Sequence, residues 1–126
     1  MPYVYSNAED LAKKPPVGTK QCVALIKQYT SAPMTVMWKE GAMVKGNLHL
    51  AKGTAIATFI NSKYPNQGTG NHAAFYIGQD AIGIWVVDQW STSKTIKSRR
   101  LSFRGQDNAG KFVNPSNNGD AFSVIE

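Results

Sequence analysis

The sequence contains a single cysteine, Cys22, at a position where a helix is expected to begin. Thr19 is suited to the N-cap, because its hydroxyl can accept a hydrogen bond from a backbone N–H two or three residues further on. This places Cys22 in the first helical turn, where free amides and the helix dipole stabilise the nucleophilic thiolate. The alternative is a small buried hydrophobic residue, since Cys22 shares a helix face with Ile26 and Tyr29.

A cysteine nucleophile requires a base, and the sequence contains two histidines. His49 lies in the loop-like segment 47–50, and we interpret it as a surface residue. His72 follows a glycine-rich loop and opens an apolar strand, which makes it the candidate base. In that strand His72, Ala74 and Tyr76 share a face. The small side chain of Ala74 is expected to leave room for a helix against this face.

A third group must orient the histidine, and the following hairpin can supply it. If the turn centres on Asp80, His72 lies directly opposite Asp88, with Cβ atoms about 4.5–5.5 Å apart. Asp88 is then able to accept from one ring nitrogen and to stabilise the imidazolium. Aspartate is depleted in strands, which makes Asp88 unusual, although it could also be a strand-end residue in solvent. A turn shifted by half a residue would place Gln89 opposite the histidine instead, so this alternative stays open.

Periodicity and turn-forming residues predict the elements that must position these groups. Ser6 and Glu9 have the spacing of a capping box and predict a short helix that ends before Pro15. The helix that carries the cysteine is expected to end at about Thr30, and residues 34–52 are expected to be irregular. Strands are predicted at residues 54–60, 72–78, 82–90, 96–103 and 121–125. This order indicates an α+β fold with N-terminal helices packed on a small antiparallel sheet.

The length of 126 residues predicts one domain, residues 1–126, which buries about two-thirds of the surface that its unfolded chain exposes. The cysteine and the two histidines lack the close ligand pairs of a zinc site, so no metal or other cofactor is expected. Segment 1–10 has early acidic residues and no apolar core, and is not typical of a signal peptide. The apolar run 82–87 is too short to span a bilayer, so membrane insertion is not expected.

The formal net charge is +6, which favours an anionic partner such as nucleic acid or the carboxylate-rich bacterial cell wall. The sequence shows no nucleic-acid-binding module, basic helix or zinc finger, so nucleic acid is not the expected partner. Five basic residues gather late in the chain: Lys94, Lys97, Arg99, Arg100 and Arg104. We interpret this group as a solvated strand edge that its charges protect from aggregation.

With Cys22, His72 and Asp88 in this order, the chain resembles papain-like cell-wall hydrolases of the CHAP and NlpC type. The resemblance rests on four segments, 18–23, 52–59, 71–78 and 84–90, within a stretch that covers a little over half of the chain. Asp88 matches the family by position only, because many members have His, Asn, Gln or Glu there. The usual Gly-Asp at the start of the strand that precedes the histidine strand is Gly53-Thr54 here. The whole chain, including its ending at residues 114–120, is similar to type VI secretion amidase effectors.

The resemblance implies a cysteine amidase or endopeptidase that cleaves amide bonds in peptidoglycan stem peptides or cross-links through a Cys-His-Asp triad. Four further residues are candidates for the substrate cleft or, equally, for structural roles: Gln21, Trp38, Asn71 and Trp90. In the effector setting, a secretion machine delivers the protein into the periplasm of a target bacterium, and a cognate immunity protein protects the producer. The alternatives are a phage-type lysin, a catalytically inactive wall-binding module, and a cysteine transferase or deamidase that acts on proteins.

Overall fold

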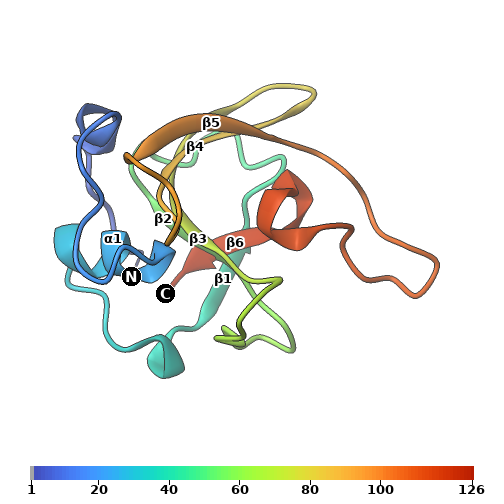
Figure 1. The fold of residues 1–126 in the computed structure, drawn as a ribbon. Helices are drawn as coiled ribbons and strands as arrows, with labels where there is room; N and C mark the ends of the chain where they lie inside the picture. The colour runs from blue at the N-terminus through green and yellow to red at the C-terminus, as the bar shows by residue number, and fades with distance from the viewer. Residues whose placement is uncertain (1) are drawn as a thin grey trace.

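The structure, a computed structural model, describes residues 2–126, in which six strands form one antiparallel sheet (Figure 1). The strands lie in the order β1-β6-β2-β3-β4-β5, and every neighbouring pair is antiparallel. They span β1 (Glu40–Met43), β2 (Ala55–Thr58), β3 (Ala73–Gln79), β4 (Gly83–Asp88), β5 (Lys97–Ser102) and β6 (Phe122–Ile125). The helices are α1 (Cys22–Tyr29) and the short 3-10 turns η1 (Ala8–Leu11), η2 (Thr35–Met37), η3 (Pro115–Asn117) and η4 (Gly119–Ala121).

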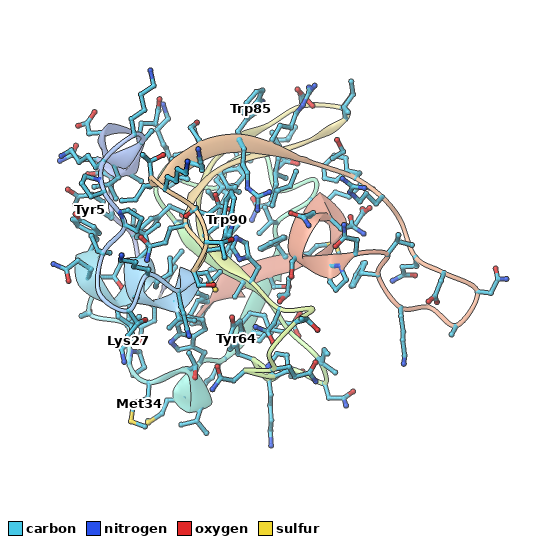
Figure 2. All side chains as sticks on the ribbon, in the orientation of Figure 1. Tyr5, Lys27, Met34, Tyr64, Trp85 and Trp90 are labelled. Atoms are coloured by element: carbon cyan, nitrogen blue, oxygen red, sulfur yellow. The ribbon has the colours of Figure 1, made fainter. Side chains whose placement is uncertain are left out.

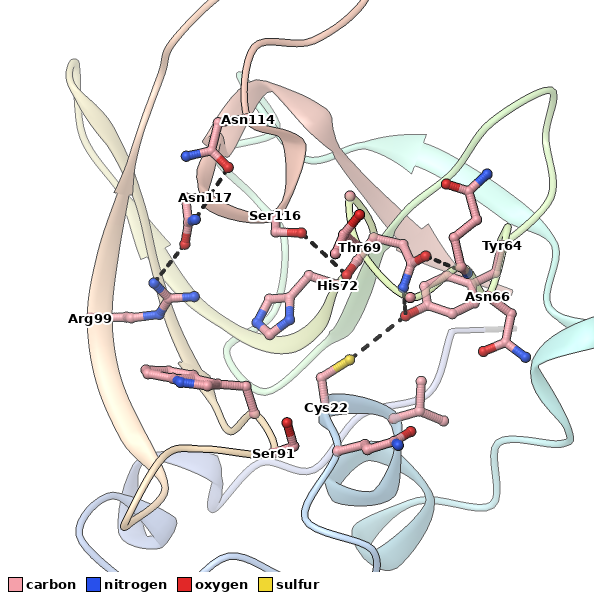
Figure 3. Close-up of a pocket in the computed structure, with 17 residues that line it drawn as sticks. Cys22, Tyr64, Asn66, Thr69, His72, Ser91, Arg99, Asn114, Ser116 and Asn117 are labelled. Carbon is pink, nitrogen blue, oxygen red and sulfur yellow. Dashed lines mark hydrogen bonds between the residues drawn. The ribbon is translucent and has the colours of Figure 1, made fainter.

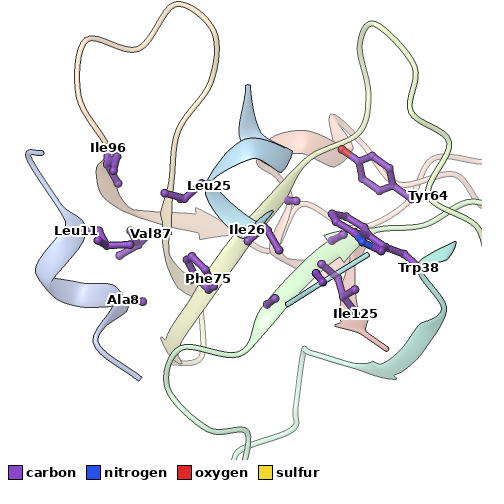
Figure 4. Close-up of a cluster of buried hydrophobic side chains, with 14 residues drawn as sticks. Ala8, Leu11, Leu25, Ile26, Trp38, Tyr64, Phe75, Val87, Ile96 and Ile125 are labelled. Carbon is purple, nitrogen blue, oxygen red and sulfur yellow. The ribbon is translucent and has the colours of Figure 1, made fainter. Parts of the chain in front are cut away.

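Each face of the sheet carries its own apolar core, because side chains alternate along the strands. On one face, Leu25 and Ile26 of α1 pack with Phe75 and Val87 (Figure 4). Leu11 of η1 joins the same cluster, so both N-terminal helices cover this face. The predicted α+β architecture, with N-terminal helices on an antiparallel sheet, is confirmed. No helix within residues 2–126 has the length and apolar character needed to cross a bilayer.

The capping residues predicted for the two N-terminal helices are wrong. The N-cap of α1 is Gln21, in an extended conformation and without a side-chain capping bond, and not Thr19. The predicted capping box is also absent from the described chain, since η1 starts after Asn7 without a side-chain cap and Glu9 pairs with Lys52. Cys22 nevertheless occupies the first turn of α1 as predicted. The helix starts directly after the extended residue Gln21, without a capping side chain.

The β3–β4 hairpin differs from its predicted register by two residues. Phe75 lies opposite Val87, where the prediction placed it opposite Trp85, and a bulge follows Tyr76. The turn lies at residues 80–82, one residue later than predicted, which accounts for the shift. On the His72 side of the bulge the shift is even, so the faces of His72 and Asp88 still agree.

Helix α1 packs on the face of β3 that carries Ala73 and Phe75, and not on the face of Ala74 as predicted. Ala74 packs instead with Tyr76 and Phe122 on the opposite face. The prediction failed because the small Ala73 side chain offers a helix the same close approach. As a result, the N-terminus of α1 meets the His72 face only at the end of the sheet, where β3 begins and β4 ends.

Candidate active site

A cavity of about 660 Å³ opens at this end of the sheet and contains Cys22 and His72 in its wall (Figure 3). The rest of its lining comes from the residue before α1, the loop 64–71, the end of β4, Arg99 of β5 and the segment around η3. Most of these side chains are polar amides and hydroxyls. The lining therefore resembles a site for a polar, hydrogen-bonding ligand more than an apolar pocket.

Cys22 is positioned by a buried side chain directly after β4, Gln89. Its Oε1 accepts from the Val17 backbone N–H at 2.9 Å, and its Nε2 donates to the carbonyls of Val17 and Gln21 at 3.1 and 2.8 Å. These bonds fix the turn that leads into α1. The alternative of Gln89 as the partner of the histidine is therefore wrong, because this side chain is used on the other face of the strand.

His72 donates from Nε2 to Asp88 Oδ2 at 2.7 Å, because the ionised carboxylate can only accept, and both side chains are buried. This bond leaves ring atom Nδ1 as the nitrogen available to Cys22. Burial alone would lower the pKa of His72, but the hydrogen bonds and negative charges of Asp88 and Cys22 outweigh it and raise the pKa to about 9. The imidazolium form is therefore favoured at neutral pH.

The cysteine lies among groups that favour its thiolate. Burial raises the pKa of Cys22, but the hydrogen bond and charge of His72, the Tyr64 hydroxyl and the Ala73 backbone N–H together lower it below its ordinary value. The Tyr64 hydroxyl is 3.7 Å from Sγ, and Asn71 Nδ2 donates to the same hydroxyl oxygen at 3.1 Å. A thiolate can only accept, so the Tyr64 hydroxyl donates to the sulfur in that state while its oxygen accepts from Asn71.

The carboxylate of Asp88 has a second partner that sequence analysis did not identify. Arg99 donates from Nε to Asp88 Oδ2 at 2.9 Å, and its Nη2 lies 2.8 Å from the same oxygen. These contacts with His72 and Arg99 lower the pKa of Asp88, although burial acts to raise it. Asp88 is therefore an ionised carboxylate between two cationic groups.

Comparison with known proteins identifies the family. The model of the domesticated amidase effector 2 family matches residues 6–125, nearly the whole chain. The chain belongs to this family. It is also 43% identical, over the full length of both chains, to the type VI secretion amidase effector 2 protein of Salmonella typhi. A solved structure of the type 6 secretion amidase effector 2 (Tae2) superposes with a TM-score of 0.92 at 40% identity, covering 98% of this chain and 94% of that one.

These matches confirm the resemblance to type VI secretion amidase effectors and the papain-like fold class. Of the four candidate cleft residues of this amidase effector, Gln21, Asn71 and Trp90 lie in the cavity wall. Trp38 does not, and its placement in the cleft is wrong: it is 3% exposed in the core, where its Nε1 donates to the Pro33 carbonyl at 2.9 Å.

Trp38 reaches the site only through Tyr64, whose ring centroid lies 5.0 Å from that of the indole. The second histidine, His49, is exposed in a loop and does not line the cavity, as the sequence indicated. Among residues 2–126, no group of three or more His, Cys, Asp or Glu side chains is arranged so that it could hold a metal ion.

The site residues of this amidase effector that sequence analysis missed are Tyr64, Arg99 and Asn117. Tyr64 stands in an irregular loop, where no periodicity indicates its direction. Arg99 was grouped with the exposed charges of β5, which is indeed the edge strand, but Arg99 is only partly exposed and faces the cavity. A signal existed for Tyr64 alone, since a large aromatic residue in a loop rich in Gly and Asn is unusual for a purely solvated segment.

Proposed function

We propose that residues 1–126 are a single cysteine amidase domain that hydrolyses amide bonds of bacterial peptidoglycan, with Cys22 as nucleophile, His72 as proton carrier and Asp88 as its orienting partner. The observation that supports this most strongly is that a partly buried sulfur and an imidazole line one cavity, with a buried carboxylate bonded to the imidazole behind the cavity wall. The 2.7 Å bond between His72 and Asp88 fixes the ring with its other nitrogen free for the sulfur. This arrangement has the components that cysteine acyl transfer needs.

The first half of the reaction forms a thioester. The Cys22 thiolate attacks the carbonyl carbon of the scissile amide, and the carbonyl oxygen takes up the negative charge. The backbone N–H of Cys22 lies in the first turn of α1, where amides have no partner within the helix, and it is available to donate to this oxyanion. The His72 imidazolium then gives its proton to the amine nitrogen as the C–N bond breaks.

The second half releases the acyl group. His72, now neutral, takes a proton from water as the water oxygen attacks the thioester carbonyl. The C–S bond breaks, the carboxylic acid product leaves, and the thiolate–imidazolium pair is restored. Asp88 stays ionised and keeps the ring oriented, and the hydroxyl of Tyr64 stabilises the sulfur whenever it is charged.

The biological setting follows from the relatives, which are named as type VI secretion effectors. Delivery by such a machine into the periplasm of a target bacterium places the enzyme beside its substrate. The net charge of +6 suits a carboxylate-rich polymer. A cognate immunity protein is the expected partner, and the acyl-transfer steps need no cofactor.

The test is digestion of purified sacculi, with the released fragments identified by mass spectrometry. The wild-type protein is expected to release new muropeptides whose masses identify the broken amide bond. Cys22→Ala and His72→Ala are expected to release none, while the matched variant His49→Ala is expected to retain full activity. Sacculi left intact by correctly folded wild-type protein at several pH values would overturn the proposal.

A further inference from the structure

Arg99 binds the carboxylate that His72 also uses. Its Nε lies 2.9 and 3.2 Å from the two oxygens of Asp88, and its Nη2 lies 2.8 Å from Oδ2. The Asp88 side chain is completely buried. A carboxylate removed from water needs a cationic partner, and here it has two.

The guanidinium of Arg99 is itself held on two further sides. Its Cζ lies 4.8 Å from the centre of the Trp90 ring, a cation–π arrangement. Its Nη1 donates to Asn117 Oδ1 of η3 at 2.9 Å, and Asn117 is in contact with Asn114 at 3.3 Å. Together with Asp88, these partners come from two segments of the chain far apart in sequence, residues 88–90 and 114–117. A side chain used only to keep a strand edge soluble would not need them.

Resting on the proposed function, we propose that Arg99 is a positioning residue that enables His72 to give up its proton. In the mechanism above, His72 is neutral once the amine has left. At that stage Asp88 would be a buried carboxylate without a counter-ion if Arg99 were missing, and proton release would be opposed. The charge of Arg99 compensates Asp88 throughout the cycle, and its two-pronged contact keeps the carboxylate aligned with the ring.

The charged groups that face His72 define whether the loss of Arg99 strengthens or weakens the hold of His72 on its proton. They are Cys22 of α1, Asp88 of β4 and, through that carboxylate, Arg99 of β5. Tyr64 of the loop 61–71 faces the sulfur from the other side. Removing the positive charge of Arg99 leaves the negative charge of Asp88 to act on the imidazolium alone. His72 should then hold its proton more tightly.

The decisive experiment is an NMR titration of the histidine rings in wild type, Arg99→Gln and Arg99→Lys, together with the initial rate of sacculus digestion. In Arg99→Gln the titration midpoint of His72 is expected to rise by about one pH unit or more, a tenfold change in proton affinity, and digestion is expected to slow by about tenfold. Arg99→Lys keeps the charge but loses the two-pronged contact. It is expected to leave the midpoint near that of wild type and to slow digestion several-fold.

The matched control is Arg100→Gln, which removes the neighbouring arginine and should change neither measurement, while His49 serves as the internal reference. A folded Arg99→Gln protein with the wild-type midpoint and rate would overturn the proposal. If Arg99→Gln does not fold, Arg99→Lys decides: a slower rate supports the proposal, and a wild-type rate overturns it. The titration needs no substrate, so failure of wild type to digest sacculi would count against the proposed function while the midpoints still test Arg99.

Discussion

Two clusters in the β4–β5 region have the same composition and very different surroundings. We call Asp88, Arg99 and Trp90 the buried cluster, and Asp80, Arg100 and Trp85 the exposed cluster. In each, an arginine of β5 binds an aspartate and lies over a tryptophan ring, with Cζ 4.8 Å from the ring centre in the buried cluster and 5.4 Å in the exposed one. Trp90 and Trp85 lie on opposite sides of the β5 ribbon (Figure 2).

Burial separates the two clusters. The side chain of Asp88 is 0% exposed and that of Asp80 is 45% exposed, while Arg99 and Arg100 are 28% and 38% exposed. Water screens the exposed pair, and Asp80 relies mainly on the backbone N–H groups of its turn. In the buried cluster each charge depends on its partner. Arg99 and Arg100 are adjacent arginines of β5, yet only Arg99 compensates a buried charge. The face of the strand on which each side chain lies decides this difference.

The largest effect is expected for Asp88→Asn, which removes the charge with little change in shape. The new amide places N–H groups against Arg99 or His72, and leaves the guanidinium uncompensated. We expect unfolding in urea to show a loss of about 3 kcal/mol, the lower end for a broken buried pair because Arg99 is partly hydrated. Sacculus digestion is expected to slow by about 100-fold or more, since His72 loses the group that orients it.

The matched variant at the exposed cluster is Asp80→Asn. Its remaining Oδ1 still accepts from the backbone N–H groups of Ile82 and Gly83, so only the exposed ion pair with Arg100 is lost. Neither stability nor digestion should change measurably. Equal losses in the two variants would mean that burial does not set the difference between the clusters.

A smaller effect is expected for Tyr64→Phe, which tests whether the buried polar network continues past Cys22. The variant keeps the ring against Trp38 but removes the hydroxyl that faces the sulfur. A hydrogen bond to a charged group contributes about 1.5–3 kcal/mol, so digestion should slow by about 10- to 100-fold. Tyr76→Phe, which loses only a hydroxyl bonded to Gln79, is the control and should leave the rate unchanged. Similar digestion rates for the two variants would mean that the Tyr64 hydroxyl does not contribute to the reaction.

The sequence was sufficient for features that depend on local periodicity. Alternation with a period of two keeps His72 and Asp88 on one face for any register shift of an even number of residues, which is why the pairing survived a register error of two residues. The helix start at Cys22 likewise follows from the turn before it. Strands with an alternating or continuous apolar pattern were found, although their ends differ by one or two residues.

Features that depend on what covers a residue could not be predicted. Five of the six residues of β5 are polar, with Leu101 the exception, so the strand offers little local contrast between Arg99 and Arg100. The segment that covers Arg99 is η3, whose Asn117 lies 18 residues further along the chain. β1 was missed because it is short and largely exposed, without an alternating pattern. The sequence is equally consistent with Trp38 in the cleft wall or in the core, and only its contact with Tyr64 in the folded chain decides between them.

The proposed mechanism requires Cys22 to be a thiolate paired with the imidazolium of His72. Cys22 is the only cysteine, so the rate of its alkylation by iodoacetamide reports this state directly. The pKa of Cys22 is below its ordinary 9.0 and that of His72 is raised from 6.5 to about 9. The ion pair should therefore exist above the lowered pKa of Cys22 and below the pKa of His72. Digestion should decline as the pH rises through about 9. The hydrogen bond between the His72 imidazolium and Asp88 contributes its full stabilisation to the fold below pH 6.5. This stabilisation is lost as the pH rises from 6.5 through about 9.

The most direct measurement is the pH dependence of that alkylation in wild type and His72→Ala. Wild type is expected to react rapidly at about pH 7, well below the ordinary thiol pKa. His72→Ala is expected to react only at high pH, because burial then raises the pKa of the unpaired thiol. Identical profiles in the two proteins, both rising only near pH 9, would contradict the ion pair and with it the proposed mechanism.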